Sequence, residues 1–198
     1  MRIIGGNFKG KKILDPQDKE TRPLKDLAKE SIFNILKHSN KFSIKIENSI
    51  ILDLFSGVGS FGLECLSRGA KYVTFVENYS GVLPILKKNL SNLKIEEKYQ
   101  VISENILNKI DFKRIINKCD IIFLDPPYKD KNLSTILRSI IANKNLGKNG
   151  IIIIHRHKKE DDLLPDNPVS YTHLRAHEPK ANRVCRLLLE KKKGGGGG

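Results

Sequence analysis

The chain has 198 residues, of which 36 are basic and 22 acidic, giving a formal net charge of +14. This length suits one domain with a small appendage and allows a hydrophobic core to be buried. An apolar run of about 18 residues and a charged-then-apolar leader are both missing from the sequence, which argues against membrane insertion or secretion. We therefore expect a soluble cytoplasmic protein, and the basic excess indicates a polyanionic partner such as nucleic acid.

The three cysteines, Cys65, Cys119 and Cys185, are far apart and form no CxxC motif. This spacing favours neither a disulfide framework nor a zinc site and fits a reducing compartment. We expect no metal.

The N-terminal residues, MRIIGGNFKGKKIL, contain two short β-capable pieces around a glycine-rich turn. They predict a hairpin that carries Arg2, Lys9, Lys11 and Lys12. After Thr21-Arg22-Pro23, apolar residues recur at helical spacing, which predicts a helix from Pro23 to about His38. Residues 1–40 are thus expected to form a basic extension.

Residues 41–168 alternate apolar strands with amphipathic helices. Repeated βα units predict parallel strands with right-handed crossovers, and hence a doubly wound α/β domain. Ligands of such domains bind outside the carboxyl ends of the strands. The predicted strands are 50–55, 72–77, 100–102, 120–124 and 151–154, and the predicted helices lie near 60–68, 80–91, 106–117 and 132–145.

The first βα unit contains a glycine-rich turn, LDLFSGVGSFG, in which Gly57, Gly59 and Gly62 form GxGxxG. Glycines there let the backbone approach a ligand at a helix N-terminus. Glu77 follows Gly57 by about 20 residues at a strand end, where a carboxylate can bind ribose hydroxyls. A glycine-rich turn with an acid at the end of the next strand occurs in binding sites for both dinucleotides and S-adenosylmethionine.

Asp53 favours S-adenosylmethionine, because a buried acid before the loop can orient an ammonium group, whereas a pyrophosphate gains nothing from a negative charge. Phe55 lies in the same loop. After the third predicted strand, Ser103-Glu104-Asn105-Ile106 could place a polar side chain and a backbone N–H against the adenine edge.

The fourth predicted strand ends abruptly in Asp125-Pro126-Pro127-Tyr128. The prolines lack backbone donors and stop the strand. An exocyclic amine could donate hydrogen bonds to Asp125 and to the Pro126 carbonyl, and Tyr128 could stack on a flat base. The combination with the glycine loop indicates methylation of an amine.

The sequence resembles the RsmD-type family of bacterial methyltransferases. The resemblance rests on MRIIGGNFKGKKI, TRPLKDLAKESIFNIL, ILDLFSGVGSFGLECLSRGA, TFVE and IIFLDPPY, in order over about residues 1–165. It implies a Rossmann-like class I S-adenosylmethionine-dependent methyltransferase that modifies guanine N2 of small-subunit (16S) ribosomal RNA, free or in an assembling 30S particle, and works as a monomer.

The resemblance also implies roles for single residues. Catalytic roles fall on Asp125, Pro126 and Tyr128. Cofactor contacts fall on Asp53, Phe55, Gly57, Gly59, Glu77, Asn105 and Ile106. RNA contacts, or contacts at the mouth of the site, fall on Arg2, Lys9, Lys12 and Arg22.

Two positions depart from the family pattern. Leu24 stands where a threonine usually follows Arg-Pro, and His155 stands where the fifth strand usually ends in an acid. His155 and His157 have no metal-like spacing, so we interpret them as polar residues at a strand end.

Residues 169–198 change in character and end in three lysines and five glycines. We interpret this segment as a non-native or disordered tail that resembles adapter or vector read-through; a genuine basic extension is the alternative. The final strand pair of the family's sheet would fall here, so its presence is left open.

Other functions remain open at this point. The enzyme could methylate another amine, such as adenine N6 in RNA or DNA. A protein that binds RNA in ribosome assembly without turnover is a second possibility. A nicotinamide dehydrogenase is a third, which is disfavoured because it leaves the DPPY motif without a role.

Overall fold

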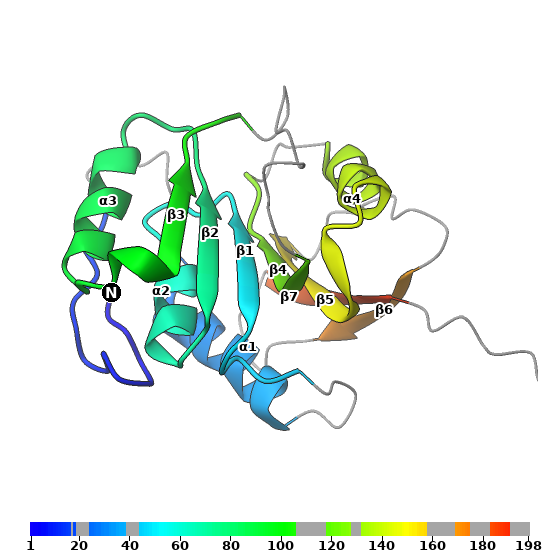
Figure 1. Cartoon of the computed structure of the whole chain (residues 1–198), viewed down its shortest axis with the longest axis horizontal. Helices are drawn as coiled ribbons and strands as arrows, with labels where there is room; N and C mark the ends of the chain where they lie inside the picture. Colours follow the sequence, from blue (N-terminus) through cyan, green and yellow to red (C-terminus); the bar gives the residue numbers. More distant parts are fainter. Residues whose placement is uncertain are drawn as a thin grey trace, which may run out of the picture.

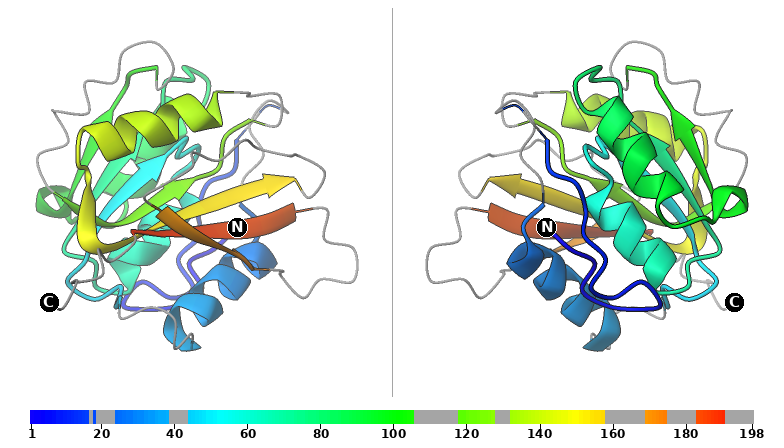
Figure 2. Two further views of the ribbon diagram at one scale, coloured as in Figure 1. Left: turned by 90° about the vertical axis from the view of Figure 1, so that its right-hand side faces the viewer. Right: turned by 90° about the vertical axis from the view of Figure 1, so that its left-hand side faces the viewer.

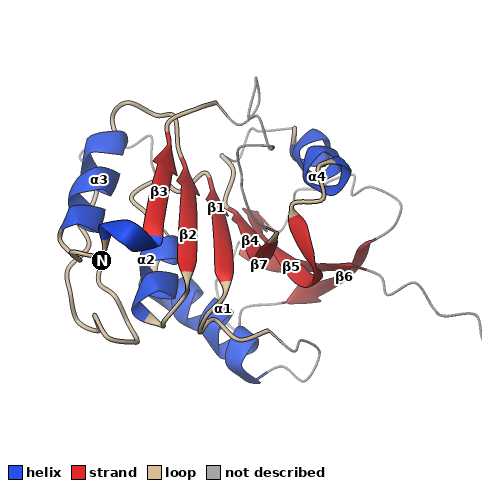
Figure 3. Ribbon diagram, in the orientation of Figure 1, coloured by secondary structure: helices blue, strands red, loops and turns tan. Residues whose placement is uncertain are grey.

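The computed structural model describes residues 1–16, 18, 24–38, 44–105, 118–127, 132–157, 169–174 and 183–190. Figure 1 shows the arrangement, and Figure 3 separates helices from strands. The helices are α1 (Asp26–His38), α2 (Ser60–Ser67), α3 (Leu83–Ser91) and α4 (Leu133–Ala142), with a 3-10 turn η1 (Glu96–Lys98). The strands are β1 (Ile50–Leu54), β2 (Tyr72–Val76), β3 (Tyr99–Ile102), β4 (Cys119–Leu124), β5 (Leu146–His157), β6 (Val169–Leu174) and β7 (Arg183–Glu190).

The strands form one seven-stranded sheet in the order β3-β2-β1-β4-β5-β7-β6. Pairing is parallel from β3 to β5, whereas β7 pairs antiparallel with both β5 and β6. The chain winds outward from β1 in one direction and from β4 in the other. The strand order therefore switches between β1 and β4, where open α/β sheets bind their ligands.

The sheet is apolar on both faces, and alternate strand residues supply two separate cores. On one face, Ile51 and Phe123 pack with residues of α1, α2 and α3. On the other face, Leu52 and Ile122 pack with α4. Figure 2 shows α4 on the side of the sheet opposite α1 and α2. This three-layer arrangement confirms the doubly wound α/β prediction.

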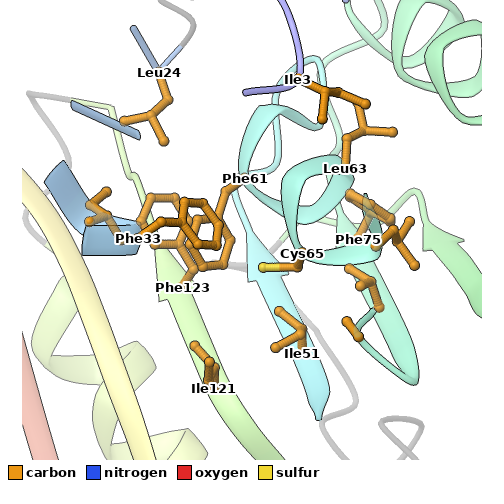
Figure 4. Packing of buried hydrophobic residues seen from close by; sticks show 14 of the residues in the cluster. Ile3, Leu24, Phe33, Ile51, Phe61, Leu63, Cys65, Phe75, Ile121 and Phe123 are labelled. Carbon is orange, nitrogen blue, oxygen red and sulfur yellow. The ribbon is translucent and has the colours of Figure 1, made fainter. Parts of the chain in front are cut away.

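Three aromatic rings join α1, α2 and β4 in the first core (Figure 4). The rings of Phe33 and Phe61 lie 5.4 Å apart and those of Phe61 and Phe123 lie 4.0 Å apart, both stacked. Stacked aromatic pairs contribute about 0.5–1.5 kcal/mol beyond the area they bury. The stack holds α2, and with it the glycine loop, against β4, the strand that Asp125 follows.

The N-terminal hairpin is present, although its strand pairing is reduced to a single bridge between Arg2 and Lys12. Its turn packs on the last residue of α2, where Ser67 accepts the N–H of Asn7 at 2.7 Å and its hydroxyl accepts the N–H of Phe8 at 2.9 Å. Farther along, the N–H of Leu14 donates to the buried Asn89 side chain at 2.8 Å. The N-terminal segment therefore packs along α2 and α3.

A buried charge network ties this segment to α1 and α2. The Lys29 side chain is fully buried, and its ammonium group lies 3.9 Å from Glu64 and donates to the Arg2 carbonyl at 2.7 Å. Glu64 also accepts the N–H of Ile4 at 2.8 Å and the Arg68 guanidinium at 2.8 Å. Burial lowers the pKa of Lys29, an effect that the neighbouring Glu64 opposes. We define Lys29, Glu64 and Arg68 as the N-terminal ion network.

The strand pair that closes the sheet, whose presence the sequence left open, is found in the structure. Residues 169–174 and 183–190 form β6 and β7, and β7 pairs along β5 from Ile151 to His157. The backbone of β7, with the sequence RVCRLLLE, pairs with the backbone donors and acceptors of β5, whose edge would otherwise be open. The non-native origin of this segment stays a prediction.

The other predicted elements lie where expected, with shifts at their ends. The first helix begins at Asp26 rather than Pro23, and β5 extends well beyond the predicted 151–154. The helix predicted at 106–117 lies outside the described residues. Cys65 and Cys119 are both buried.

Candidate active site

The loop between β1 and α2 has the backbone that its glycines predict. Gly57 and Gly59 have φ of 56° and 85°, in the left-handed region that side chains rarely adopt. A Cβ on Gly59 would lie only 2.6 Å from a methyl carbon of Leu86. Phe55, also predicted as a cofactor residue, has φ of 58°, so the strand turns sharply as soon as β1 ends. The loop is therefore tightly turned, and Gly59 packs closely against α3.

Glu77 follows β2 and holds this loop from the neighbouring strand. One carboxylate oxygen accepts the N–H of Gly57 at 2.8 Å, and the other accepts those of Asn78 and Tyr79, each at 2.8 Å. A carboxylate offers about four acceptor positions, so one position is left for a hydroxyl donor. Glu77 thus combines the predicted place for a ribose ligand with an unpredicted structural role in the loop.

Asp53 lies within β1, is 1% exposed and accepts the N–H of Gly62 at 3.0 Å. Burial raises the pKa of Asp53 well above its ordinary value, and the nearby charges of Asp125 and Glu77 raise it further. Among the described residues, no cationic side chain pairs with Asp53. A ligand cation placed here would oppose these effects, because an opposite charge favours the ionised carboxylate.

Asp125 begins the loop after β4, beside the end of β1. Its N–H points to the Leu54 carbonyl at 3.5 Å, and its side chain is 17% exposed. The following Pro126 is buried, whereas Pro127 is exposed. The structure therefore brings Asp53, Glu77 and Asp125 to one edge of the sheet, as the sequence predicted. We call these three carboxylates the site carboxylates.

His155 is a site residue that the sequence analysis missed. It is 3% exposed on β5, and its Nδ1 lies 3.0 Å from an oxygen of Asp125. We interpreted it as a polar residue at a strand end, and the structure instead places it against the predicted catalytic acid. The two residues meet through the β4–β5 pairing of Leu124 with Ile154, because the next residues of the two strands are Asp125 and His155.

Several other predicted residues are placed less completely. Asn105 is exposed just after β3, whose last carbonyl, that of Ile102, accepts the N–H of Glu77 at 3.1 Å. The predicted adenine-edge position therefore adjoins the ribose position. Tyr128, Ile106 and Arg22 lie outside the described residues.

The basic residues of the hairpin are exposed, but the turn lies away from the site carboxylates. The turn containing Lys9 packs at the C-terminal end of α2, whereas the glycine loop leads into the N-terminal end. Lys9 is consequently not at the mouth of the site. Arg2 and Lys12 are paired in the hairpin and are also exposed.

The site fits S-adenosylmethionine better than a dinucleotide. The cofactor carries an ammonium and a sulfonium group, which match the buried, cation-free Asp53 beside the other carboxylates. A pyrophosphate would meet three carboxylates at the same edge. Glu77 and the Gly57–Gly59 backbone would hold the ribose and the methionine part.

In the part of the chain that the structure describes, no group of three or more His, Cys, Asp or Glu residues could hold a metal ion. The described helices include none with the length and hydropathy needed to cross a membrane.

The parallel sheet, its switch point and these loops define a Rossmann-like fold of the class I methyltransferase type. The solved structure described as "Putative methyltransferase yhhF from Escherichia coli" is similar at a TM-score of 0.75 and 27% identity, covering 98% of this chain and 99% of that one.

The sequence comparisons place the chain more narrowly. The family model described as conserved hypothetical protein 95, which corresponds to the RsmD family, matches residues 1–186, and the chain belongs to this family. Ribosomal RNA small subunit methyltransferase D of Haemophilus influenzae is 34% identical over 168 residues, 84% of each chain. The protein of the same name in Buchnera aphidicola subsp. Acyrthosiphon pisum is 35% identical over 170 residues, 85% of this chain and 84% of that one.

Proposed function

We propose that this protein transfers the methyl group of S-adenosylmethionine to the exocyclic N2 amine of a guanine in bacterial small-subunit ribosomal RNA. The observation that carries the proposal is the position of Asp125 and Pro126 at the switch point, beside Asp53 and the glycine loop. Relatives named as small-subunit ribosomal RNA methyltransferases support the RNA class. The proposed enzyme works in the cytoplasm as a monomer.

The bound cofactor supplies an electrophilic methyl group on a sulfonium that leaves as a neutral thioether. Asp53 would bind its ammonium group and Glu77 a ribose hydroxyl, with Asn105 and Ile106 at the adenine edge. A cationic ligand would also be favoured by the neighbouring carboxylates, because Asp125 and Glu77 both disfavour the negative charge of Asp53 in its absence.

The amine nitrogen of a guanine is a poor nucleophile because its lone pair is delocalised into the ring. Asp125 and the Pro126 carbonyl would accept its two N–H groups and so favour the tetrahedral nitrogen of the transition state. Pro126 is buried and its φ is fixed by the ring, which restrains the backbone that carries its carbonyl. Tyr128 would stack on the base for about 1–3 kcal/mol.

Positioning provides most of the acceleration in this scheme. Holding two reactants in line can lower a barrier by about 7–11 kcal/mol. A base inside a duplex cannot reach a slot beside a strand end, so the target guanine must be unpaired or flipped out.

The test is transfer of a labelled methyl group from S-adenosylmethionine to small-subunit particles, or naked RNA, from cells that lack the modification. Digestion and mass spectrometry identify the nucleoside. The proposal predicts N2-methylguanosine. N6-methyladenosine would replace it with the adenine alternative, and RNA binding without transfer would indicate the assembly protein.

A further inference from the structure

The contact between His155 and Asp125 has no part in the methyl transfer described so far. We propose that His155 is a positioning residue, which fixes the Asp125 carboxylate for the incoming amine. The inference rests on the proposed function, because it assigns a role within amine methylation. Its basis is the 3.0 Å contact between His155 Nδ1 and Asp125 Oδ1.

The two residues meet because of strand register. Leu124 of β4 pairs with Ile154 of β5, so the residues that follow lie side by side at the carboxyl edge of the sheet. The imidazole is 3% exposed and the carboxylate 17% exposed. The pair thus has a buried partner that is held by packing and a partly exposed partner that can reach a substrate.

Asp125 needs such a partner for two reasons. Its backbone N–H is 3.5 Å from the Leu54 carbonyl, a long contact that restrains the strand end weakly. Its side chain also shares an edge with Asp53 and Glu77, and like charges repel one another. A donor on one oxygen holds the carboxylate in place against this repulsion.

The direction of the hydrogen bond follows from the chemistry. An ionised carboxylate can only accept, so Nδ1 of His155 carries the proton and donates it to Oδ1. The bond uses one of the two carboxylate oxygens. A carboxylate offers about four acceptor positions, so Asp125 can accept an N–H of the amine as well as that of His155.

Amide side chains distinguish positioning from simple packing. The amide nitrogen of His155→Asn takes the place of Nδ1, whereas that of His155→Gln takes the place of Nε2. His155→Leu fills much of the space without a donor. Ile153→Val, at another buried residue of β5, serves as the packing control.

The experiment measures the single-turnover rate of methyl transfer, the Kd values for S-adenosylmethionine and RNA, and the Tm of each variant. Losing a hydrogen bond to a charged group corresponds to about a 10- to 100-fold lower rate, which we expect for His155→Leu and His155→Gln. His155→Asn should regain most of this rate. Both Kd values should stay within about twofold of wild type, because the hydrogen bond to Asp125 acts in the transition state.

Equal rates in the Asn, Gln and Leu variants would overturn the inference. It would also be overturned if their rates fell with the Tm in the same proportion as in Ile153→Val. Wild-type protein separates this result from failure of the proposed function. If wild type makes N2-methylguanosine while the His155 variants keep its rate, the inference alone fails. If wild type methylates no amine, the proposed function fails, and the inference with it.

Discussion

Two buried carboxylates in this protein have opposite surroundings. Glu64 of α2 is fully buried between Lys29 and Arg68 and accepts a backbone N–H from the N-terminal segment. Asp53 of β1 is 1% exposed and, within the described residues, has a backbone donor but no cationic partner. The charge of the first acid is balanced inside the protein, which makes it structural. The second remains unbalanced, as expected of an acid that binds a cationic ligand.

The largest effect is expected at Asp125, the most exposed of the site carboxylates. Asp125→Ala removes the acceptor for the amine and should lower methyl transfer by about a thousandfold or more, as do losses of groups that act directly on the reacting atoms. S-adenosylmethionine binding, measured by calorimetry, should be nearly unchanged. Full activity in this variant would remove Asp125 from the mechanism.

The next largest effect should fall on stability, at the N-terminal ion network. Lys29→Met leaves Glu64 with one cation fewer, and breaking a buried ion pair costs about 3–5 kcal/mol. Chemical denaturation measures the free energy of unfolding. The matched control is Lys37→Met, an exposed lysine of the same helix that should change it little. Equal losses in both variants would show that the network contributes nothing specific.

Asp53→Asn should separate binding from stability. The neutral amide keeps an acceptor for Gly62 but cannot balance an ammonium group, so affinity for S-adenosylmethionine should fall by about tenfold or more. Without cofactor, the variant should have a higher Tm than wild type at neutral pH, because it removes the cost of ionising a buried acid.

The sign follows from the raised pKa of Asp53. The folded state holds this proton more tightly than the unfolded state, so stability is full below the unfolded pKa and is lost as pH rises through the folded pKa. The Tm advantage of Asp53→Asn should therefore grow with pH and vanish in acid. Glu96→Gln, at an exposed acid, should show neither effect. A wild-type Tm equal to that of Asp53→Asn at every pH would contradict this explanation.

The smallest effects are expected at the exposed lysines of the hairpin. Lys9→Glu and Lys12→Glu should each weaken RNA binding a few-fold and lower the slope of affinity against salt by about 1. The slope is measured by titrating RNA at several salt concentrations. Lys148→Glu makes the same charge change on β5. A matching loss in that control would mean that net charge, rather than the hairpin, explains RNA affinity.

Much of the site was predictable, because its residues sit in local patterns. The glycine loop, Asp53, Glu77 and Asp125 each follow or end an apolar strand, and parallel strands bring their carboxyl ends together.

The remainder depends on distant pairing. His155 meets Asp125 through the register of β4 and β5, and Lys29 meets Glu64 across two packed helices. Neither contact leaves a periodic signal in the sequence. The sequence left the presence of β6 and β7 open because the composition of their segment argued against regular structure.

The contrast between the two acids is tested most directly by proton release on cofactor binding. Calorimetric titration with S-adenosylmethionine, in buffers that differ in ionisation enthalpy and over an acid-to-neutral pH series, counts the protons released. We predict that wild type releases protons as Asp53 becomes ionised beside the bound cation, whereas Asp53→Asn releases fewer. The same release from both proteins at every pH would contradict the claim that Asp53 is left unbalanced for a cationic cofactor.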